Sequence, residues 1–402
     1  MAPVMGNRSW SGEPPDGTWL RDRAAIVGVG RTTYGKRGEL AGRGTTALAA
    51  EAILDACADA GVSAADLDGF TSYANDTADV AALSAAFNAQ RLRFTGMAWG
   101  VGGGSMLGAF LHAAMAVATG QAKLVAVVHA IVQPPAGRFG GMGAARTPPK
   151  YPAVRTPAQT FAMQARRHMH LYGTTMDHFG AVAVSTRAYA VNNPDARFRD
   201  PITLEDHHAS RVIADPLHLL DCCMESDGAC CVLIAATTRA QDLRRAPVLI
   251  SAATMGAAGR WGHGQFGGYN MPDVDYASAG QRTVAEDLYR NAAIGPGEID
   301  VAMIYDHFTP MVLMALEDFG FAPRGEGGPF VADGNLRPGG AIPTNTHGGN
   351  LSEVYLHGMT HVFEAVRQCR RTSANQIPGA ETALVAGGAS SAPSSAMLLR
   401  RA

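Results

Sequence analysis

The chain has 402 residues, of which 47% are hydrophobic and 17% are charged, and its formal net charge at pH 7 is −2. This composition excludes a chain that is disordered throughout, and the near-balanced charge gives no bias toward nucleic acid or anionic membranes. The sequence has no uninterrupted apolar run of about 18 residues, so we expect no membrane span. The length favours two or three domain-sized units.

The N-terminal segment, residues 1–23, is polar and lacks the apolar centre of a secretion signal, so we interpret it as a loosely ordered arm. A chain without such a signal is expected in the reducing cytoplasm. We therefore interpret the neighbours Cys222–Cys223 and Cys230–Cys231 as thiols that pack as small hydrophobic groups. The spacing typical of zinc ligands is absent, and we predict no metal site.

Short apolar runs bounded by Gly or Pro alternate with alanine-rich helical patterns. The expected buried strands are Ala24–Gly28, Leu124–Val132, Cys230–Ala236, Pro247–Thr254, Val301–Phe308 and Leu384–Gly388. The expected helices are Thr46–Ala60, Met106–Thr119, Met176–Val191, Gln281–Ala293 and Leu351–Cys369. Continuous apolar strands that alternate with helices indicate an α/β fold with covered sheets.

A faint internal repeat indicates a duplication. Ala50-Glu51, a helix and then Asp66–Phe70 resemble Ala285-Glu286, a helix and then Glu298–Ala302. We therefore divide the chain into an N-terminal half, 24–245, and a C-terminal half, 246–402. Residues 131–213 form an inserted loop region of the first half, because the Pro-, Gly- and Arg-rich start of that region is typical of a loop.

Acidic residues are absent between Val80 and Met176, while nine basic residues occur there. These are Arg91, Arg93, Lys123, Arg138, Arg146, Lys150, Arg155, Arg166 and Arg167. The window is compatible with a solvated face and with a site for a phosphate-bearing ligand.

Two glycine-containing turns were weighed as phosphate or oxyanion sites. Gly28-Val29-Gly30 follows a strand, but position 33 is Thr, so a dinucleotide site is disfavoured. Gly102–Ser105 precedes a helix, where backbone N–H groups suit an oxyanion or a phosphate, although a plain tight turn has the same pattern.

Two polar clusters follow in the C-terminal half. Tyr305–Phe308 ends an apolar strand, where α/β sheets place ligands, and it equally suits a turn that caps the next helix. Asn345–Asn350 opens a second cluster, which continues to His357. The pair His357 and His361 has zinc-like spacing but lacks the order H-E-x-x-H, so a metal is disfavoured.

Taken together, these motifs resemble the thiolase superfamily over nearly the whole chain, from about Ala24 onward. The opening AAIVGVGRTTYGKRG is similar to the family's first strand and turn, and Asp227-Gly228-Ala229 resembles its D-G-A element. The resemblance implies a duplicated thiolase fold of two βαβαβαββ halves, layered α-β-α-β-α.

The residues that carry thiolase chemistry are missing. Alignment without gaps places the family's nucleophilic cysteine at Gly103 and its catalytic histidine at Tyr355, and no cysteine follows the C-terminal turn Gly387-Gly388-Ala389. The N-E-A-F element is replaced by Tyr305–Phe308. Without a thiolate, no group can accept an acyl chain, which excludes Claisen chemistry.

Tyr-Asp-His-Phe-Thr-Pro, together with Asn-Thr-His-Gly-Gly and a tyrosine six residues later, looks like the thiolase-like aldolases of bacterial steroid side-chain degradation. This resemblance implies retro-aldol cleavage of a β-hydroxyacyl-CoA with no covalent intermediate. In the best-known group, 17-hydroxy-3-oxopregn-4-ene-20-carboxyl-CoA yields androst-4-ene-3,17-dione and propionyl-CoA. It implies no cofactor besides the CoA that the substrate carries.

From the same resemblance we expect Tyr305 to act as base and Tyr355 as acid. Asp306, His307 and His347 are supporting residues. A cationic donor or a hydrogen bond to the phenolate is expected to lower the pKa of a tyrosine, and His307 and His347 are the nearest candidates by sequence. The backbone N–H groups of Gly103 and Gly388 are the expected oxyanion donors.

The family also implies that the basic window binds CoA phosphates and that the chain forms a homodimer through the thiolase core. A separate OB-fold protein with a zinc ribbon is the further expected partner, giving a heterotetramer. Two alternatives stay open. One is an aldolase for another sterol or bile-acid side chain, and the other is a non-catalytic scaffold that binds acyl-CoA or lipid.

Overall fold

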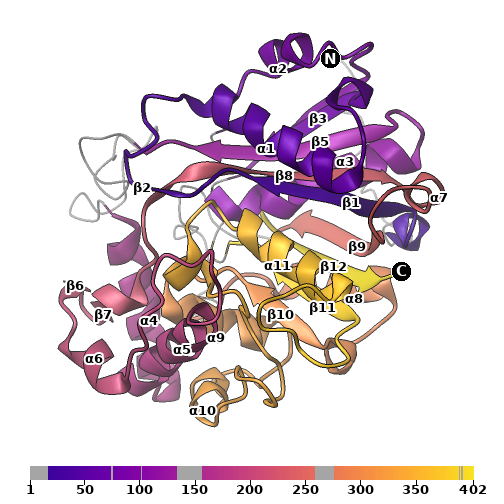
Figure 1. Cartoon of the computed structure of the whole chain (residues 1–402). Coiled ribbons are helices and arrows are strands. Elements are labelled where there is room, and N and C mark those ends of the chain that lie inside the picture. Colours follow the sequence, from indigo (N-terminus) through magenta and orange to yellow (C-terminus); the bar gives the residue numbers. More distant parts are fainter. Residues whose placement is uncertain are drawn as a thin grey trace, which may run out of the picture.

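A computed structural model describes residues 17–73, 76–100, 102–133, 156–258, 276–388, 390 and 393–402. The strands of the N-terminal half are β1 (Ala24–Arg31), β2 (Gly35–Lys36), β3 (Gly69–Tyr73), β4 (Phe94–Ala98), β5 (Leu124–Ile131) and β8 (Ser226–Ala236). Those of the C-terminal half are β9 (Val248–Gly256), β10 (Val301–Ile304), β11 (Thr382–Ala386) and β12 (Ser394–Arg401). They form one mixed sheet in the order β10-β11-β12-β9-β1-β8-β5-β3-β4, and β2 pairs with β8 (Figure 1).

The strand order repeats the same pattern outward from the centre. β1 pairs antiparallel with β8, β8 antiparallel with β5, and β5 parallel with β3. In the other half, β9, β12, β11 and β10 follow one another with the same directions. The halves join where β1 meets β9 through two Cα pairs, Ala25 with Leu249 and Ile26 with Val248. This arrangement is what a duplicated α/β unit predicts.

Helices and strands form five alternating layers. One apolar cluster surrounds the central helices, and one more lies under the outer helices of each half. The outer helix α1 (Thr45–Ala60) covers one face of the N-terminal strands, and α8 (Arg282–Ala292) and α9 (Thr309–Asp318) cover the outer face of the C-terminal strands. Between the two sets of strands lie α3 (Met106–Ala118) and α11 (Met359–Arg370). Alternate residues of one strand enter different clusters, as when Val385 faces the central helices and Leu384 the outer ones. Figure 1 shows α11 between the purple strands and the orange and yellow ones.

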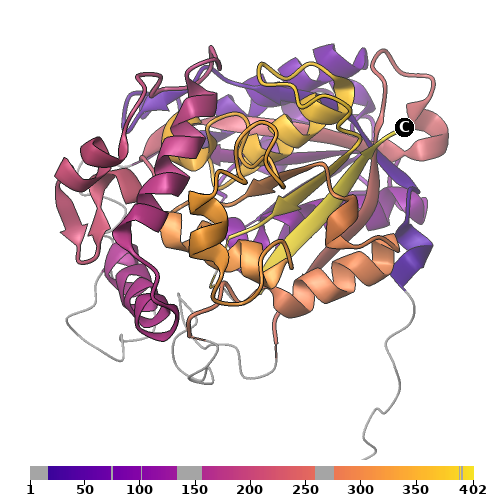
Figure 2. The same cartoon turned by 90° about the horizontal axis from the view of Figure 1, so that it is seen from below.

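The described part of the inserted region contains the predicted helix Met176–Val191, as α5, and further elements where a loop was expected. Its described part contains α4 (Pro157–Tyr172), α5 (Met176–Ala190), α6 (Leu204–Ala209) and the hairpin of β6 (Val212–Ala214) and β7 (Leu217–His218). α4 begins at a capping box of Thr156 and Gln159, which ends the Pro-rich stretch. These helices flank the C-terminal half (Figure 2). Short helices elsewhere are α2 (Val80–Ala86), α7 (Thr237–Ala240) and α10 (Gly327–Ala332).

Two predicted elements are shorter than expected, and both differences shape the site. The predicted strand Val301–Phe308 ends at Ile304. The predicted helix Leu351–Cys369 begins only at Met359, because Gly349–Glu353 form a π-helical turn and Gly358 has a left-handed backbone (φ 88°). Tyr355 and His357 therefore lie in an irregular segment and not on a helix face. Among the described helices, none has the length and apolar character that crossing a membrane requires.

Candidate active site

Tyr305 and Tyr355 meet in the interior between the two halves. Tyr305 directly follows β10, and Tyr355 lies between the π-helical turn and α11. The Tyr305 hydroxyl donates a hydrogen bond to the Tyr355 hydroxyl at 3.2 Å, and the ring planes are inclined by 64°. Both side chains are buried. The fold thus brings together two motifs that are 50 residues apart in the sequence.

Both phenols keep their protons at neutral pH. Burial raises the pKa of Tyr305 well above its usual range, and the neighbouring Tyr355 and Cys223 raise it further. Burial and Cys223 also raise the pKa of Tyr355, although the hydrogen bond from Tyr305 acts in the opposite direction. A buried phenol of this kind is a good proton donor and a weak base, unless another group takes its proton at the same time.

The Tyr305 ring occupies the space that a side chain at position 103 would need. A Cβ atom placed on Gly103 would lie 2.5 Å from Cζ of Tyr305 and closer still to Cε2. Real Cβ atoms do not approach neighbours this closely, so a cysteine at position 103 and this tyrosine ring exclude each other. The missing nucleophile and the new tyrosine are therefore one structural change.

The turn Gly102–Ser105 is fixed against the end of β11. The N–H of Gly388 donates to the carbonyl oxygen of Gly103 at 2.9 Å. A Cβ on Gly388 would lie 2.7 Å from the backbone nitrogen of Gly104, so the approach requires glycine. The role of Gly388 as an oxyanion donor stays a prediction, because its N–H is already engaged with Gly103. Ala389 lies outside the described residues.

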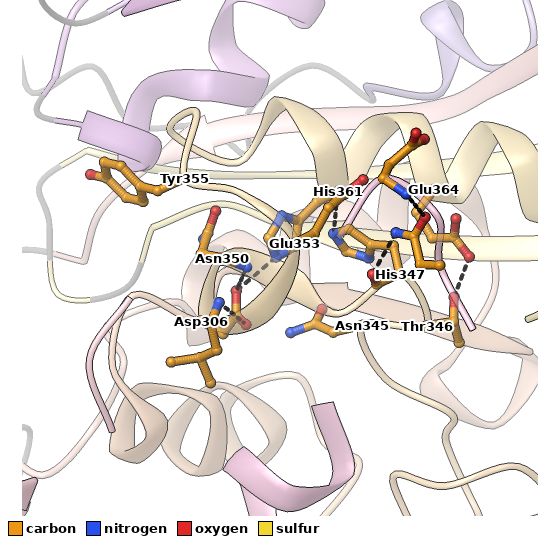
Figure 3. A network of polar contacts seen from close by, with 12 residues as sticks. Asp306, Asn345, Thr346, His347, Asn350, Glu353, Tyr355, His361 and Glu364 are labelled. Carbon is orange, nitrogen blue, oxygen red and sulfur yellow. Dashed lines mark hydrogen bonds and ion pairs between the residues drawn. The ribbon is translucent and has the colours of Figure 1, made fainter. Parts of the chain in front are cut away.

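Asp306 holds the segment that carries Tyr355. Its carboxylate accepts the backbone N–H groups of Asn350 at 2.7 Å and Leu351 at 3.2 Å. His361 Nε2 lies 3.1 Å from the same carboxylate. A Cβ on Gly349 would overlap with Asp306, and Gly349 also has a positive φ of 57°. Figure 3 shows the Tyr355 ring pointing away from this network, so Asp306 positions the segment without facing the phenols.

His307 and His347 do not supply the expected positive charge. The centroid of the His307 ring lies 4.4 Å from that of Phe161 and 5.0 Å from that of Tyr305. Burial lowers the pKa of His307 to about 4. His347 packs against His361 and has its Nε2 atom 3.6 Å from Glu353. Burial also lowers the pKa of His347 well below its usual range. Both imidazoles are neutral at pH 7, so neither of them is a cationic donor to the tyrosines.

Cys223 is a neighbour of both tyrosines that the sequence interpretation missed. Its N–H donates to the carbonyl oxygen of His307 at 3.0 Å, and Cys222 pairs with Phe308 in an isolated bridge. Burial raises the pKa of Cys223, which keeps it a neutral thiol. All six cysteines are free, as predicted. No local motif marks Cys223, because only the folded chain brings it to the tyrosine pair.

A buried row of one carboxylate and two imidazoles was also missed. Asp76 Oδ2 lies 3.0 Å from His129 Nδ1, and His129 Nε2 lies 2.8 Å from His357 Nδ1. In the sequence, His357 is paired only with His361 by its zinc-like spacing, whereas in the structure His361 contacts Asp306. The sequence did contain a signal for this row, because His129 is the single polar residue of the apolar strand β5. Among the described residues, no group of three His, Cys, Asp or Glu side chains is placed to hold a metal ion.

The basic window is only partly described. Arg138, Arg146, Lys150 and Arg155 lie outside the described residues. Arg93 forms an ion pair with Asp68 at 3.2 Å, and Arg166 forms one with Asp215. Phosphate binding by this window stays a prediction.

Comparisons with known proteins agree with this site. A family model, thiolase C-terminal domain-like, matches residues 268–401. The 17-hydroxy-3-oxo-4-pregnene-20-carboxyl-CoA lyase of Mycobacterium tuberculosis is 42% identical, over 94% of this chain and 100% of its own length. The steroid side-chain-cleaving aldolase of Thermomonospora curvata is also 42% identical, over 94% of this chain and 98% of its own.

Solved structures that resemble this chain include an aldolase and a thiolase. The Ltp2-ChsH2(DUF35) aldolase has a TM-score of 0.87 at 41% identity, covering 95% of this chain and 98% of the other. Human mitochondrial 3-ketoacyl-CoA thiolase has a TM-score of 0.67 at 13% identity, covering 95% and 99%, and shares the fold alone. With a thiolase fold and full-length relatives of this kind, the chain belongs to the thiolase-like family of steroid side-chain-cleaving aldolases.

Proposed function

We propose that the protein cleaves a carbon–carbon bond of a β-hydroxyacyl-CoA by a retro-aldol reaction. The proposed substrate is 17-hydroxy-3-oxopregn-4-ene-20-carboxyl-CoA, which yields androst-4-ene-3,17-dione and propionyl-CoA. The observation that carries the proposal is the buried hydrogen bond between Tyr305 and Tyr355, beside the turn that contains Gly103. The activities named for the two relatives at 42% identity support the choice of substrate.

The reaction needs a group that takes the hydroxyl proton, a group that stabilises the thioester enolate, and a group that protonates its α-carbon. Tyr305 receives the hydroxyl proton as it passes its own proton to Tyr355, along the hydrogen bond between them. Tyr355 releases its own proton as it accepts this one, and the α-carbon is protonated from Tyr355. No free phenolate is formed, which fits two phenols whose pKa values are raised.

The enolate oxygen is placed near the turn that contains Gly103. Backbone N–H groups aimed at a developing oxyanion are worth about 10²–10³ in rate. The N–H group of Gly388 is a second donor to the enolate oxygen, once it shares its hydrogen bond between Gly103 and the substrate. The chemistry requires no cofactor beyond the CoA of the substrate, and the basic window is the proposed site for its phosphates.

We also propose how the chain assembles. β4 is the terminal strand of the sheet, and the exposed apolar residues Met97 and Trp99 lie in it and beside it. An open edge strand with exposed apolar side chains favours pairing with a second chain, which gives a homodimer. A DUF35-type protein, as named for the solved relative, is the proposed further partner. The free thiols favour a cytoplasmic location.

The test is an assay of the protein with and without a DUF35-type partner chain. We expect 17-hydroxy-3-oxopregn-4-ene-20-carboxyl-CoA to yield a 17-ketone and propionyl-CoA in equal amounts. The Tyr355→Phe protein is the matched control for product formed without enzyme catalysis. Binding of the thioester without turnover in both mixtures would show a scaffold instead of an enzyme.

A further inference from the structure

The buried row Asp76–His129–His357 crosses the molecule from the N-terminal half to the active site. Asp76 follows β3, His129 lies in β5, and His357 immediately precedes Gly358 and α11. The side chains of Asp76 and His129 are 1% and 2% exposed, and His357 is 5% exposed. Three ionisable groups this deep in the interior are costly to bury, so their arrangement calls for a reason beyond packing.

The carboxylate dictates which nitrogen atoms carry protons. Asp76 also accepts the backbone N–H groups of Ala78 at 2.7 Å and Ala130 at 3.0 Å, so it is held as an acceptor. Burial alone would raise its pKa, but the contact with His129 and the backbone N–H groups of Ala78 and Ala130 together lower it. His129 then carries its proton on Nδ1, and its Nε2 accepts from Nδ1 of His357. This order leaves the Nε2 lone pair of His357 as the acceptor at the inner end of the row.

The inner end of the row lies beside the tyrosine pair. The rings of Tyr355 and His357 are 5.1 Å apart and nearly perpendicular. A Cβ placed on Gly102 would lie 3.9 Å from Nε2 of His357, which shows that this nitrogen faces the turn next to Gly103. His357 also has a left-handed backbone, with φ of 48°, a conformation that non-glycine residues adopt at a cost.

Tyr73 contacts two residues of the row. Its ring stacks on His129 at 4.2 Å, and its hydroxyl donates to the carbonyl oxygen of His357 at 3.3 Å. Tyr73 therefore contacts the imidazole of His129 and the backbone of His357 at the same time.

We propose that Asp76, His129 and His357 form a proton relay that takes up and returns the proton of the tyrosine pair during carbon–carbon cleavage. His357 is the proton acceptor, and Asp76 and His129 are positioning residues. The inference rests on the proposed retro-aldol function, because it identifies where the proton that leaves the substrate hydroxyl is held.

The protons and electrons balance in two stages. In the first stage, the hydroxyl proton moves to Tyr305, the Tyr305 proton to Tyr355, and the Tyr355 proton to Nε2 of His357. The oxygen's electron pair forms the ketone, and the electrons of the broken carbon–carbon bond form the enolate. In the second stage, Tyr355 protonates the α-carbon and recovers its proton from His357. The net result is transfer of one proton from oxygen to carbon, with no uptake from solvent.

The kinetic test uses His357→Gln, which keeps a side chain of similar shape but removes the base. We expect kcat to fall about 100-fold or more, as is typical for loss of a general base, with KM nearly unchanged. For His357→Ala, added imidazole should restore part of kcat. The matched control is His168→Gln, because His168 is an equally buried histidine that contacts Glu317 at 3.1 Å and lies outside the row. A kcat of His357→Gln within about threefold of the wild-type value would overturn the relay.

A second measurement does not depend on turnover. In the ¹⁵N-histidine NMR spectrum of the wild-type protein, we expect a proton on Nδ1 of both His129 and His357, and we expect Asp76→Asn to change both signals. A proton on Nε2 of His357 in the wild-type protein would refute the proposal. If the wild-type protein releases no 17-ketone and no propionyl-CoA from the acyl-CoA, the proposed function fails. The NMR result still decides whether the protons of the row are ordered as inferred.

Discussion

The smallest change that separates this protein from a thiolase is a pair of residues that compete for one volume. Gly103 has no side chain, and the Tyr305 ring fills the space beside it. The interior is close-packed, so even one added carbon atom must displace the ring or the turn. At the residue scale, function therefore depends on whether position 103 or position 305 carries the larger side chain.

Gly103→Ala should therefore destabilise the protein by about 1–3 kcal/mol, the usual cost of overpacking a core. The same substitution made in a Tyr305→Ala protein should cost much less, because the ring is gone. Urea denaturation of the four proteins in this double-mutant cycle measures the coupling. Equal costs in both backgrounds would show that the ring does not exclude a Cβ at position 103.

Tyr305→Phe and Tyr355→Phe keep both rings and remove one hydroxyl each. We expect each to lower kcat at least about 100-fold while KM for the acyl-CoA stays within a few-fold, since only proton transfer is lost. Steady-state kinetics with the purified proteins measure both constants. Near wild-type kcat values for both variants would contradict the assignment of the tyrosine pair.

At the scale of elements, the segment from Asn345 to Gly358 positions Tyr355 and His357. Asn345 itself is tied to β10, since its side chain accepts the N–H of Ile304 and donates to the carbonyl oxygen of Ile304, both at 2.8 Å. Figure 3 shows this residue with Asp306 and Glu353 in the polar network behind Tyr355. A segment held by so many buried polar groups is sensitive to their protonation.

Glu353 provides the test of that sensitivity. Burial raises its pKa to about 8, although Arg367 opposes the rise. Between the ordinary value of 4.5 and pH 8, the folded protein keeps a proton that the unfolded chain has lost, so stability should fall as pH rises, by up to about 1.4 kcal/mol per pH unit. Above pH 8 this contribution no longer changes.

Glu353→Gln should flatten this dependence, because the amide does not titrate. Urea denaturation at pH 5, 6, 7 and 8 gives the slopes, and Glu205→Gln, at an exposed glutamate, is the control that should keep the wild-type slope. Parallel curves for wild type and Glu353→Gln would mean that Glu353 is ionised in the folded protein.

The limits of sequence-based prediction are clearest in the same elements. Periodicity places α1 within one residue, because Gly61 ends it with a left-handed cap (φ 73°). The resemblance to thiolases led to Tyr305 and Tyr355, and the fold brings them together. Sequence could not show that the helix after Asn350 starts late, since that depends on the contact with Asp306. It also could not bring Cys223 or Asp76 to the site, because their contacts join segments far apart in the chain.

At the scale of the whole molecule, the site is built at the seam between the duplicated halves. Gly103 and His129 come from the N-terminal half, whereas the two tyrosines and His357 come from the other. The sheet itself joins the halves through only two Cα pairs. Helix α3 of the N-terminal half also packs against β9 and β12 of the C-terminal half, and α11 packs against β8, so the central helices add contacts across the seam.

Assembly of two chains is tested at the free edge of β4. Wild-type protein should run at twice the 42.0 kDa chain mass in size-exclusion chromatography with light scattering. Met97→Lys should shift it toward one chain mass, because a charge on an apolar edge opposes pairing. Met163→Lys, at an exposed methionine of α4, is the control that should leave the mass unchanged. A Met97→Lys protein that stays at twice the chain mass would place the interface elsewhere.

The exclusion between Gly103 and the Tyr305 ring also has a historical consequence. If the ancestor had the thiolase cysteine, a tyrosine could not enter at position 305 while that cysteine remained, since no room existed for the ring. The cysteine had to become glycine first, or in the same event. In either case acyl transfer was lost no later than the tyrosine was gained, so a duplicate gene free of selection for thiolase activity is the natural place for this transition.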